Sequence, residues 1–292
     1  MPQTQAQTAV QQGAIRAGLI GRGIALSRTP AMHEAEGRAQ GIGLTYARFD
    51  LDDPAMTGRS LADVVERAEA EGFAGLNVTY PYKIEAIDLL HELSDNAHAV
   101  GAVNTIVFRH GHRKGHNTDL WGFAEGFRTE MAGAPLEEVL LLGAGGAGGA
   151  VAHALLSLGV GHLWVFDVDA GRVAGLVDKL SARYGTGRVT VADSPDRVAA
   201  RLRGLVNTTP VGTAKLPGSP LPLSLLRPDL WVADIVYFPL ETQLLAAART
   251  AGCRVLSGLG MAVFQAVRAY ELFTGRKPDP VRMRQTFEAL GP

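Results

Sequence analysis

The sequence has a single cysteine, almost no net charge and no histidine cluster with metal-ligand spacing. Cys253 is the only cysteine among 292 residues, which excludes an intrachain disulfide and argues against a cysteine-based structural zinc site. The 28 basic and 29 acidic side chains give a net charge of -1, which argues against nucleic acid or an acidic membrane surface as the main partner. We therefore expect no metal site and no nucleic-acid partner.

Segments typical of export or membrane insertion are also missing. Residues 1–12 are rich in Gln, Thr and Ala, without the basic region and apolar stretch of a signal peptide. No run of about 20 apolar residues occurs elsewhere, so we expect no transmembrane span. These absences predict a cytoplasmic protein without a membrane partner, and residues 1–13 are expected to form a disordered tail.

What the sequence does contain is a regular alternation of predicted strands and helices, typical of α/β proteins with parallel βαβ units. In the first part of the chain the expected strands are 14–20, 44–49 and 75–78. The expected helices there are 30–40, 61–70 and 83–93. A hairpin over 103–116 and a connecting helix over 119–131 follow, and a second α/β run begins at Val139.

This second run opens with a glycine-rich loop between a predicted strand and a predicted helix. The pattern G-x-G-x-x-G falls on Gly143, Gly145 and Gly148, where it permits a tight turn, a close approach to a pyrophosphate and close packing of helix on strand. The helix N-terminus adds unpaired N–H groups and the positive end of its dipole. The loop residues expected to hold a dinucleotide are Gly143, Ala144, Gly145, Gly146, Ala147 and Gly148.

An acidic residue follows the next predicted strand, about 20 residues beyond the glycines. Asp167 stands where a carboxylate accepts hydrogen bonds from the adenosine ribose, and it would repel a 2′-phosphate, so it favours NAD over NADP. Arg172 leaves NADP open, because an arginine there can bind the phosphate or merely flank the adenine. Asp169 is interpreted as a solvated turn residue.

These patterns predict two domains. An N-terminal substrate-binding and catalytic domain is expected over 14–120, and a C-terminal Rossmann dinucleotide-binding domain over 121–261. The final helices, 262–292, are expected to pack back on the first domain across a shared cleft. Amides, hydroxyls, a lysine and an aspartate gather at predicted strand ends in the first domain, which suits a polyhydroxylated carboxylic acid.

The same motifs, in the same order, make residues 17–290 resemble the shikimate dehydrogenase family. Two of the matching segments are the N-x-T-x-P-Y-K pattern that ends at Lys83 and the glycine-rich loop. The remaining matching segments are 26–33, 102–105, 117–119, 207–212, 234–237 and 258–265.

The resemblance implies a role for each matching residue. Lys83 and Asp119 would form the catalytic pair, with lysine exchanging a proton with the reacting hydroxyl and aspartate orienting it. Ser27 and Thr29 would bind the substrate carboxylate. The other residues implied to contact substrate are Asn77, Thr79, Asn104, Tyr237 and Gln265. The other residues implied to contact the cofactor are Asn207, Thr208, Thr209, Gly258 and Met261.

Two departures from the common family pattern indicate the NAD-dependent quinate/shikimate dehydrogenase branch. Thr29 replaces a second serine, and Asp167-Val168-Asp169 replaces an Asn-Arg-Thr segment that suits NADP. The expected reaction is hydride transfer between NAD and C3 of shikimate or quinate, in a monomer or homodimer. Three alternatives stay open at this point: a biosynthetic NADP-dependent shikimate dehydrogenase, a non-catalytic ligand sensor, and another lysine-using dehydrogenase such as a folate enzyme.

Overall fold

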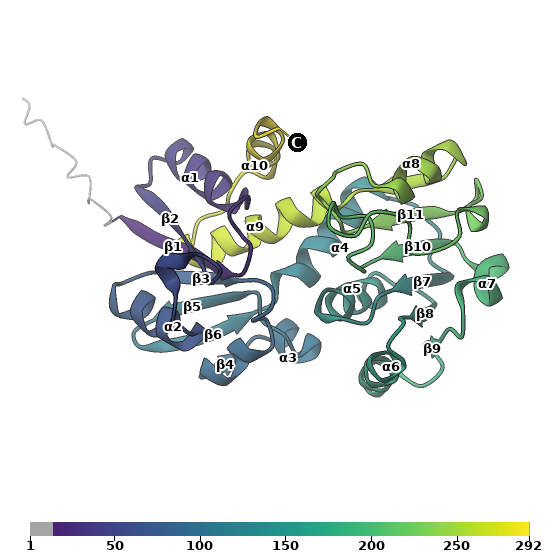
Figure 1. Ribbon diagram of the computed structural model, residues 1–292, viewed down its shortest axis with the longest axis horizontal. Helices are drawn as coiled ribbons and strands as arrows, with labels where there is room; N and C mark the ends of the chain where they lie inside the picture. Colours follow the sequence, from purple (N-terminus) through teal and green to yellow (C-terminus); the bar gives the residue numbers. More distant parts are fainter. Residues whose placement is uncertain (1–13, 292) are drawn as a thin grey trace, which may run out of the picture.

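The computed structural model describes residues 14–291, and the tail predicted at 1–13 lies outside them. Two six-stranded sheets lie at opposite ends of the molecule, and helices α4 (Thr118–Glu130) and α9 (Gly258–Thr274) pack between them (Figure 1). The α/β fold class predicted from the strand and helix alternation is confirmed.

The first sheet has the order β2-β1-β3-β5-β6-β4 and is mixed. Parallel pairing joins β2, β1 and β3, whereas β5 runs antiparallel to both β3 and β6. Its strands are β1 (Ile15–Gly21), β2 (Leu44–Asp50), β3 (Gly75–Val78), β4 (Glu92–Leu93), β5 (Thr105–Arg109) and β6 (His112–His116). The accompanying helices are α1 (Thr29–Ala39), α2 (Leu61–Ala70) and α3 (Asp95–Val100), with 3-10 turns η1 (Pro54–Met56) and η2 (Glu85–Leu89).

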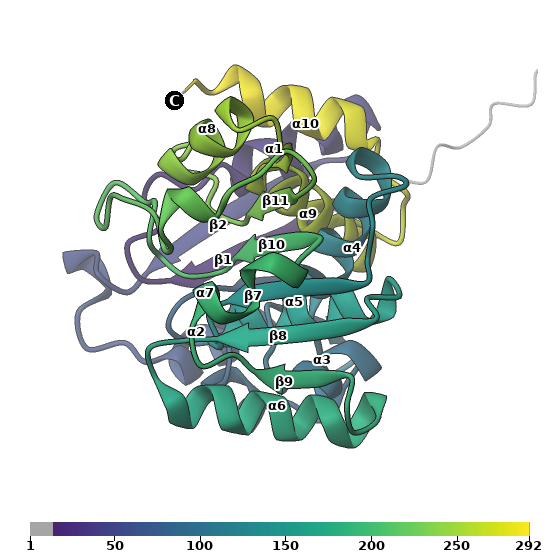
Figure 2. The same ribbon diagram turned by 90° about the vertical axis from the view of Figure 1, so that its right-hand side faces the viewer.

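The second sheet is parallel throughout, in the order β12-β11-β10-β7-β8-β9, which is the doubly wound arrangement of a Rossmann fold (Figure 2). Its strands are β7 (Glu138–Leu142), β8 (His162–Phe166), β9 (Val189–Val191), β10 (Gly204–Asn207), β11 (Trp231–Asp234) and β12 (Arg254–Leu256). The accompanying helices are α5 (Gly146–Ser157), α6 (Ala170–Tyr184), α7 (Pro195–Val198) and α8 (Gln243–Thr250), with 3-10 turns η3 (Ala199–Arg201) and η4 (Leu223–Leu225).

Glycines allow α4 and α9 to approach each other closely between the sheets. A Cβ on Gly122 would lie 2.7 Å from the backbone nitrogen of Gln265, and one on Gly126 would lie 3.3 Å from the carbonyl carbon of Gly260. Side chains larger than hydrogen at Gly122 would therefore push the helices apart. This close crossing places Gln265 beside α4.

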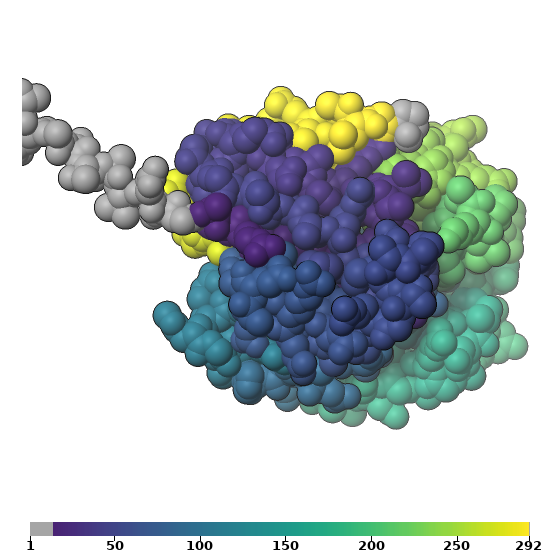
Figure 3. All heavy atoms as spheres, turned by 60° about the vertical axis from the view of Figure 1, so that its left-hand side comes forward, coloured from purple at the N-terminus to yellow at the C-terminus, as the bar shows by residue number. Residues whose placement is uncertain are grey.

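The C-terminal helix α10 (Pro280–Ala289) returns to the N-terminal part of the chain, where it packs on α1 (Figure 3). Arg282 contacts Glu36 through its Nε at 2.6 Å, and the Glu36 side chain is fully buried. Glu36 also accepts hydrogen bonds from Gln40 and from the backbone of Asp279. The buried carboxylate is thus paired with a cation and accepts further hydrogen bonds from protein groups, as a buried charge requires.

The helix predicted over 83–93 is wrong. Only the 3-10 turn η2 forms there, and the end of the segment pairs as β4 with β6. The backbone N–H of His91 donates to Arg113, which extends this pairing beyond the strand. The helical spacing of apolar residues was outweighed by a tertiary strand partner, and the short helix α3 that follows had not been expected.

Candidate active site

A cleft of about 390 Å³ opens between the two sheets. Its lining comes from the ends of β1 and β3, from the start of α4, from the β11–α8 loop and from α9. The sequence-predicted residues that line it are Ser27, Thr29, Asn77, Thr79, Lys83, Asn104, Asp119, Ala147, Tyr237, Gly258, Met261 and Gln265. Side chains more than 200 positions apart in the sequence therefore face one space.

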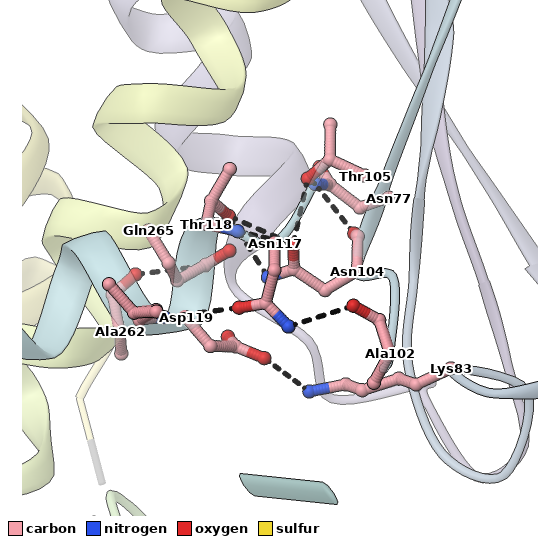
Figure 4. Close-up of polar contacts among 11 residues, drawn as sticks. Asn77, Lys83, Ala102, Asn104, Thr105, Asn117, Thr118, Asp119, Ala262 and Gln265 are labelled. Carbon is pink, nitrogen blue, oxygen red and sulfur yellow. Dashed lines mark hydrogen bonds and ion pairs between the residues drawn. The ribbon is translucent and has the colours of Figure 1, made fainter. Parts of the chain in front are cut away.

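Lys83 and Asp119 form an ion pair in this cleft. Lys83 Nζ donates to Asp119 Oδ2 at 2.6 Å, with the two side chains 24% and 10% exposed (Figure 4). Lys83 follows the end of β3, and Asp119 lies in the first turn of α4, where a carboxylate is stabilised by the helix dipole. Such a pair can exchange a proton with a bound hydroxyl while the carboxylate holds the lysine in place.

The neighbouring residues of α4 explain why Asp119 is so well placed. Asn117 caps the helix, since its Oδ1 accepts from the backbone N–H of Leu120 at 3.1 Å, and its Nδ2 donates to Ala102 at 3.0 Å. Thr118 bonds through its backbone N–H to Asn104 Oδ1 at 2.7 Å. The three residues of the N-T-D segment thus have different contacts. Asn117 caps the helix, Thr118 binds Asn104, and Asp119 faces the cleft.

Two buried asparagines lie beside this pair. Asn77 and Asn104 are each 4% exposed and both reach the cleft surface. Asn77 Nδ2 donates to Thr105 Oγ1 at 2.9 Å, and Asn104 Nδ2 donates to Thr118 Oγ1 at 2.9 Å. Their amides are fixed by neighbours before any ligand arrives, which favours selective binding of hydroxyl groups.

Ser27 and Thr29 flank the N-terminus of α1, which has no side-chain cap. The only contact between them is a long one, from the backbone N–H of Thr29 to Ser27 Oγ at 3.4 Å. Between them, Arg28 is buried against the rings of Phe238 and Phe287, at 4.4 and 4.5 Å, and donates to the Phe287 carbonyl at 2.9 Å. Arg28 was not among the predicted site residues, although its position between Ser27 and Thr29, two predicted binding residues, could have indicated it.

The opposite wall comes from the β11–α8 loop and from α9. Tyr237 is 44% exposed, yet desolvation of its hydroxyl raises the pKa of the phenol, with Asp119 adding to this shift and Lys83 opposing it. The phenol thus lies within electrostatic reach of the ion pair. Gln265 donates through Nε2 to the Ala262 carbonyl at 3.0 Å, and Met261 lies one turn earlier in the cleft wall.

The glycine-rich loop has the shape of a pyrophosphate cradle. Gly143 has φ +101°, and a Cβ on Gly148 would lie 2.1 Å from the Gly143 carbonyl, so the helix packs tightly on the turn. Side chains added at Gly145 or Gly146 would meet no atom within 4 Å, which leaves open space over the loop. The start of α5 has no side-chain cap, so its first N–H groups could bind a phosphate.

The acidic residues after β8 have separate roles. Asp167 Oδ2 accepts from the backbone N–H of Ala144 at 2.7 Å, which aims the carboxylate along the glycine loop. Asp169 was interpreted as a solvated turn residue, but it is the N-cap of α6 and accepts from the backbone N–H of Arg172 at 3.1 Å. Arg172 is 65% exposed at its side chain and pairs with Asp169 at 3.2 Å, so both lie beside Asp167 at the surface.

Below the glycine loop, a buried hydrogen-bond network joins two further motifs. Asn207 is fully buried, and its Nδ2 donates to Asp234 Oδ1 and to the Val211 carbonyl, both at 3.0 Å. Its Oδ1 accepts from Thr209 Oγ1 at 2.7 Å. Because every polar atom of Asn207 is engaged, this residue shapes the loop and does not present its side chain to a ligand.

Asp234 completes that network. The sequence had placed it in a matching segment, but no role was predicted for it. Its Oδ2 accepts from Thr242 Oγ1 at 2.7 Å, and burial raises the pKa of its carboxyl while these hydrogen bonds oppose the shift. Thr208 contributes separately, donating through Oγ1 to the Leu142 carbonyl at 2.7 Å at the foot of the glycine loop.

Among residues 14–291, no three His, Cys, Asp or Glu side chains come together as a metal site would require. Within the same residues, no helix is long and apolar enough to cross a membrane.

Comparisons with known proteins agree with this geometry. Residues 19–106 match the shikimate dehydrogenase substrate binding domain, and residues 258–286 match the shikimate 5'-dehydrogenase C-terminal domain. The chain is 50% identical to a shikimate dehydrogenase (NADP(+)) of Streptomyces avermitilis, over 91% of this chain and 92% of that protein. It is 47% identical to a quinate/shikimate dehydrogenase (NAD(+)) of Corynebacterium glutamicum, over 94% of this chain and 98% of that protein.

The structure of quinate dehydrogenase from Corynebacterium glutamicum in complex with NAD is also similar. It superposes with a TM-score of 0.91 at 46% identity and covers 94% of this chain and 99% of that one. Two domain matches, relatives near 50% identity over nine-tenths of the chain, and an ion pair in a cleft beside a Rossmann sheet all agree. The chain belongs to the shikimate dehydrogenase family, oxidoreductases that act on CH–OH groups.

Proposed function

We propose that this protein is an NAD-dependent quinate/shikimate dehydrogenase whose catalytic pair is Lys83 and Asp119. The observation that carries the proposal is the 2.6 Å contact between Lys83 Nζ and Asp119 Oδ2 in a cleft between the substrate domain and the Rossmann sheet. We assign the substrate domain to 14–120, with 262–292 packed back on it, and the dinucleotide domain to 121–261.

In the proposed mechanism the protein positions the substrate and handles one proton. Ser27 and Thr29 bind the carboxylate through their hydroxyl groups, neither of which caps helix α1. Asn77, Thr79 and Asn104 hold ring hydroxyls from one wall, while Tyr237 and Gln265 close the other. This arrangement leaves the hydroxyl to be oxidised facing the ion pair.

The neutral amine of Lys83 accepts the proton of that hydroxyl during oxidation, and the resulting ammonium returns the proton during ketone reduction. Asp119 keeps the lysine oriented through the 2.6 Å bond and stabilises its ammonium form. NAD supplies the hydride acceptor when bound. Gly258 and Met261 belong to the cleft wall near which the nicotinamide would lie.

The residues present fit a dinucleotide. Open space over Gly145 and Gly146 and the uncapped start of α5 suit the pyrophosphate, together with Ala144, Ala147 and Thr208 around the loop. Thr209 belongs to the same loop edge, held by the buried amide of Asn207.

The preference for NAD rests on Asp167, whose carboxylate accepts hydrogen bonds from the backbone N–H groups of Ala144 and Asp169. These bonds orient the carboxylate along the glycine loop, toward the adenosine ribose. A 2′-phosphate there would meet a carboxylate. Arg172 is the one feature that favours NADP, but Asp169 already engages its guanidinium. The relative named for NADP at 50% identity keeps an NADP-dependent shikimate dehydrogenase as the second candidate.

The test is a steady-state assay of reduced-nicotinamide absorbance with quinate and with shikimate, each against NAD and NADP. Turnover with NAD, at a kcat/KM at least about tenfold above that with NADP, is expected for one or both acids. A preference for NADP with shikimate alone would move the protein to the second candidate. Tight NAD binding with no turnover in any combination would indicate a ligand sensor.

A further inference from the structure

A directional chain of hydrogen bonds runs behind the substrate wall of the cleft. Tyr46 Oη donates to Asn77 Oδ1 at 2.6 Å, and Asn77 Nδ2 donates to Thr105 Oγ1 at 2.9 Å. Thr105 Oγ1 donates to Asn104 Oδ1 at 3.2 Å, and Asn104 Nδ2 donates to Thr118 Oγ1 at 2.9 Å. The chain thus begins on β2 and ends one residue before Asp119.

Backbone groups with a single hydrogen-bonding role fix the direction of this chain. The Thr118 N–H can only donate, so the Asn104 atom 2.7 Å away is the amide oxygen. The Asn104 carbonyl can only accept, so the Asn77 atom 3.3 Å away is the amide nitrogen. That second contact sets the orientation of the Asn77 amide, and the shorter bond from the Tyr46 hydroxyl restrains the amide in that orientation.

Tyr46 can reach Asn77 because the strands between them carry small residues. In the parallel register Tyr46 lies opposite Ala17, and Ala17 lies opposite Gly75. The tyrosine ring therefore crosses β1 over small side chains and meets Asn77 two residues further along β3. Burial raises the pKa of the Tyr46 phenol well above its usual value, so the hydroxyl keeps its proton and acts as a donor.

The ring of Tyr46 is held from behind by His33, whose ring centroid lies 4.8 Å away. His33 is fully buried, neither ring nitrogen has a partner, and burial lowers its pKa to about 3. It is therefore neutral and serves as packing. Tyr46 is 7% exposed and does not line the cleft, so any effect it has on a ligand passes through Asn77.

Counting donors and acceptors shows what the two asparagines leave for a ligand. Both Asn77 amide hydrogens are used, and one lone pair of its Oδ1 remains. Asn104 Oδ1 accepts from the Thr118 N–H and from the hydroxyls of Thr105 and Thr118, so no lone pair is left, and one amide hydrogen remains. The wall thus presents an acceptor from Asn77 beside a donor from Asn104, a pattern that a ring hydroxyl can satisfy by donating to one and accepting from the other.

We propose that Tyr46 is a positioning residue that determines substrate recognition by fixing the Asn77 amide with its oxygen available to a ring hydroxyl. This inference rests on the proposed function, in which Asn77 and Asn104 bind ring hydroxyls. It assigns no contact between Tyr46 and the substrate.

The test compares Tyr46→Phe with Tyr270→Phe. Tyr270 is also buried and its ring also packs on His33, 5.8 Å away, but its hydroxyl has no partner, so its loss removes a hydroxyl without breaking a bond. Tyr46→Phe should raise KM for shikimate or quinate about five- to tenfold, equivalent to about 1 to 1.4 kcal/mol. Its kcat and KM for NAD should stay within about twofold, because uniform binding is what is lost.

Tyr270→Phe should leave all three constants within about twofold of the wild type. Equal behaviour of the two variants, whether both raise KM or neither does, would overturn the proposal. Should Tyr46→Phe not fold, Thr105→Val breaks the same chain at its middle and Thr105→Ser restores the hydroxyl. The valine variant should raise KM, and failure of the serine variant to restore it would count equally against the proposal.

A second readout needs no substrate and therefore separates this inference from the proposed function. The side-chain amide hydrogens of Asn77, followed by NMR hydrogen exchange, should exchange at least about tenfold faster in Tyr46→Phe than in Tyr270→Phe. If the wild type turns over neither acid, the proposed function fails, while this comparison still decides whether Tyr46 fixes the amide. Equal exchange in both variants would overturn the positioning role.

Discussion

Asp167 and Asp169 lie two residues apart, yet their carboxylates serve different structures. Asp167 accepts from the backbone of the glycine loop, whereas Asp169 accepts from the first turn of α6 and pairs with Arg172. At the scale of single residues, one carboxylate is therefore bound to the glycine loop and the other caps a helix. Either can be removed separately from the other.

Asp167→Ala should raise KM for NAD about 10- to 100-fold, because hydrogen bonds to a charged group are worth about 1.5–3 kcal/mol. The discrimination against NADP should shrink, since the carboxylate that repels the 2′-phosphate is gone. Both constants are measured by steady-state kinetics with the two cofactors.

Asp169→Ala is the matched control. Loss of the cap should lower the free energy of unfolding by about 1 kcal/mol, measured by urea denaturation, with KM for NAD changed less than about twofold. A larger change of KM in Asp169→Ala than in Asp167→Ala would reverse the roles assigned to the two carboxylates.

At the scale of elements, α10 is fastened to α1 beside the cleft. The Glu36 carboxylate is fully buried and its charge is balanced by Arg282, which is 40% exposed. Phe287 of α10 packs on Arg28 and lines the cleft, so the ion pair that holds α10 in place also supports the cleft wall beside Ser27 and Thr29. Removal of one partner leaves the other charge buried and unpaired.

Arg282→Met should therefore lower the free energy of unfolding by more than Arg249→Met does, because it leaves the buried Glu36 carboxylate unpaired. Arg249→Met, which removes the exposed pair between Arg249 and Glu241, should cost less than about 1 kcal/mol. Urea denaturation of both variants measures the difference. Equal losses in the two variants would show that α10 is not fastened by Glu36.

Elements were predictable from the sequence where local signals and tertiary contacts agree. Helix α2 covers residues 61–70 as predicted, and a capping box of Ser60 and Asp63 fixes its start. The segment 83–93 failed because β6 supplies a strand partner that no local pattern reveals. Asp169 was misjudged for a related reason, since a helix cap and a solvated turn use the same residue types.

At the scale of the whole molecule, the order of motifs along the chain was enough to expect a Rossmann sheet, a second α/β unit and a cleft between them. The hydrogen-bond chain that starts at Tyr46 was not predictable, because it depends on the register of β1, β2 and β3. The burial of Asn207 also depends on tertiary packing around β10 and β11. The motifs thus indicate which residues meet in the cleft, and tertiary packing determines which of their polar atoms remain available for hydrogen bonds to a ligand.

The central claim is that Lys83 carries the proton transfer, and Lys83→Ala compared with Lys114→Ala tests it most directly. Lys114 also pairs with a carboxylate, Glu92 at 2.5 Å, but it lies on β6 and does not line the cleft. With NAD and the better of the two acids, kcat should fall about 10²- to 10⁴-fold in Lys83→Ala and stay within about twofold in Lys114→Ala. A Lys83→Ala enzyme that kept kcat within about tenfold of the wild type would contradict the account.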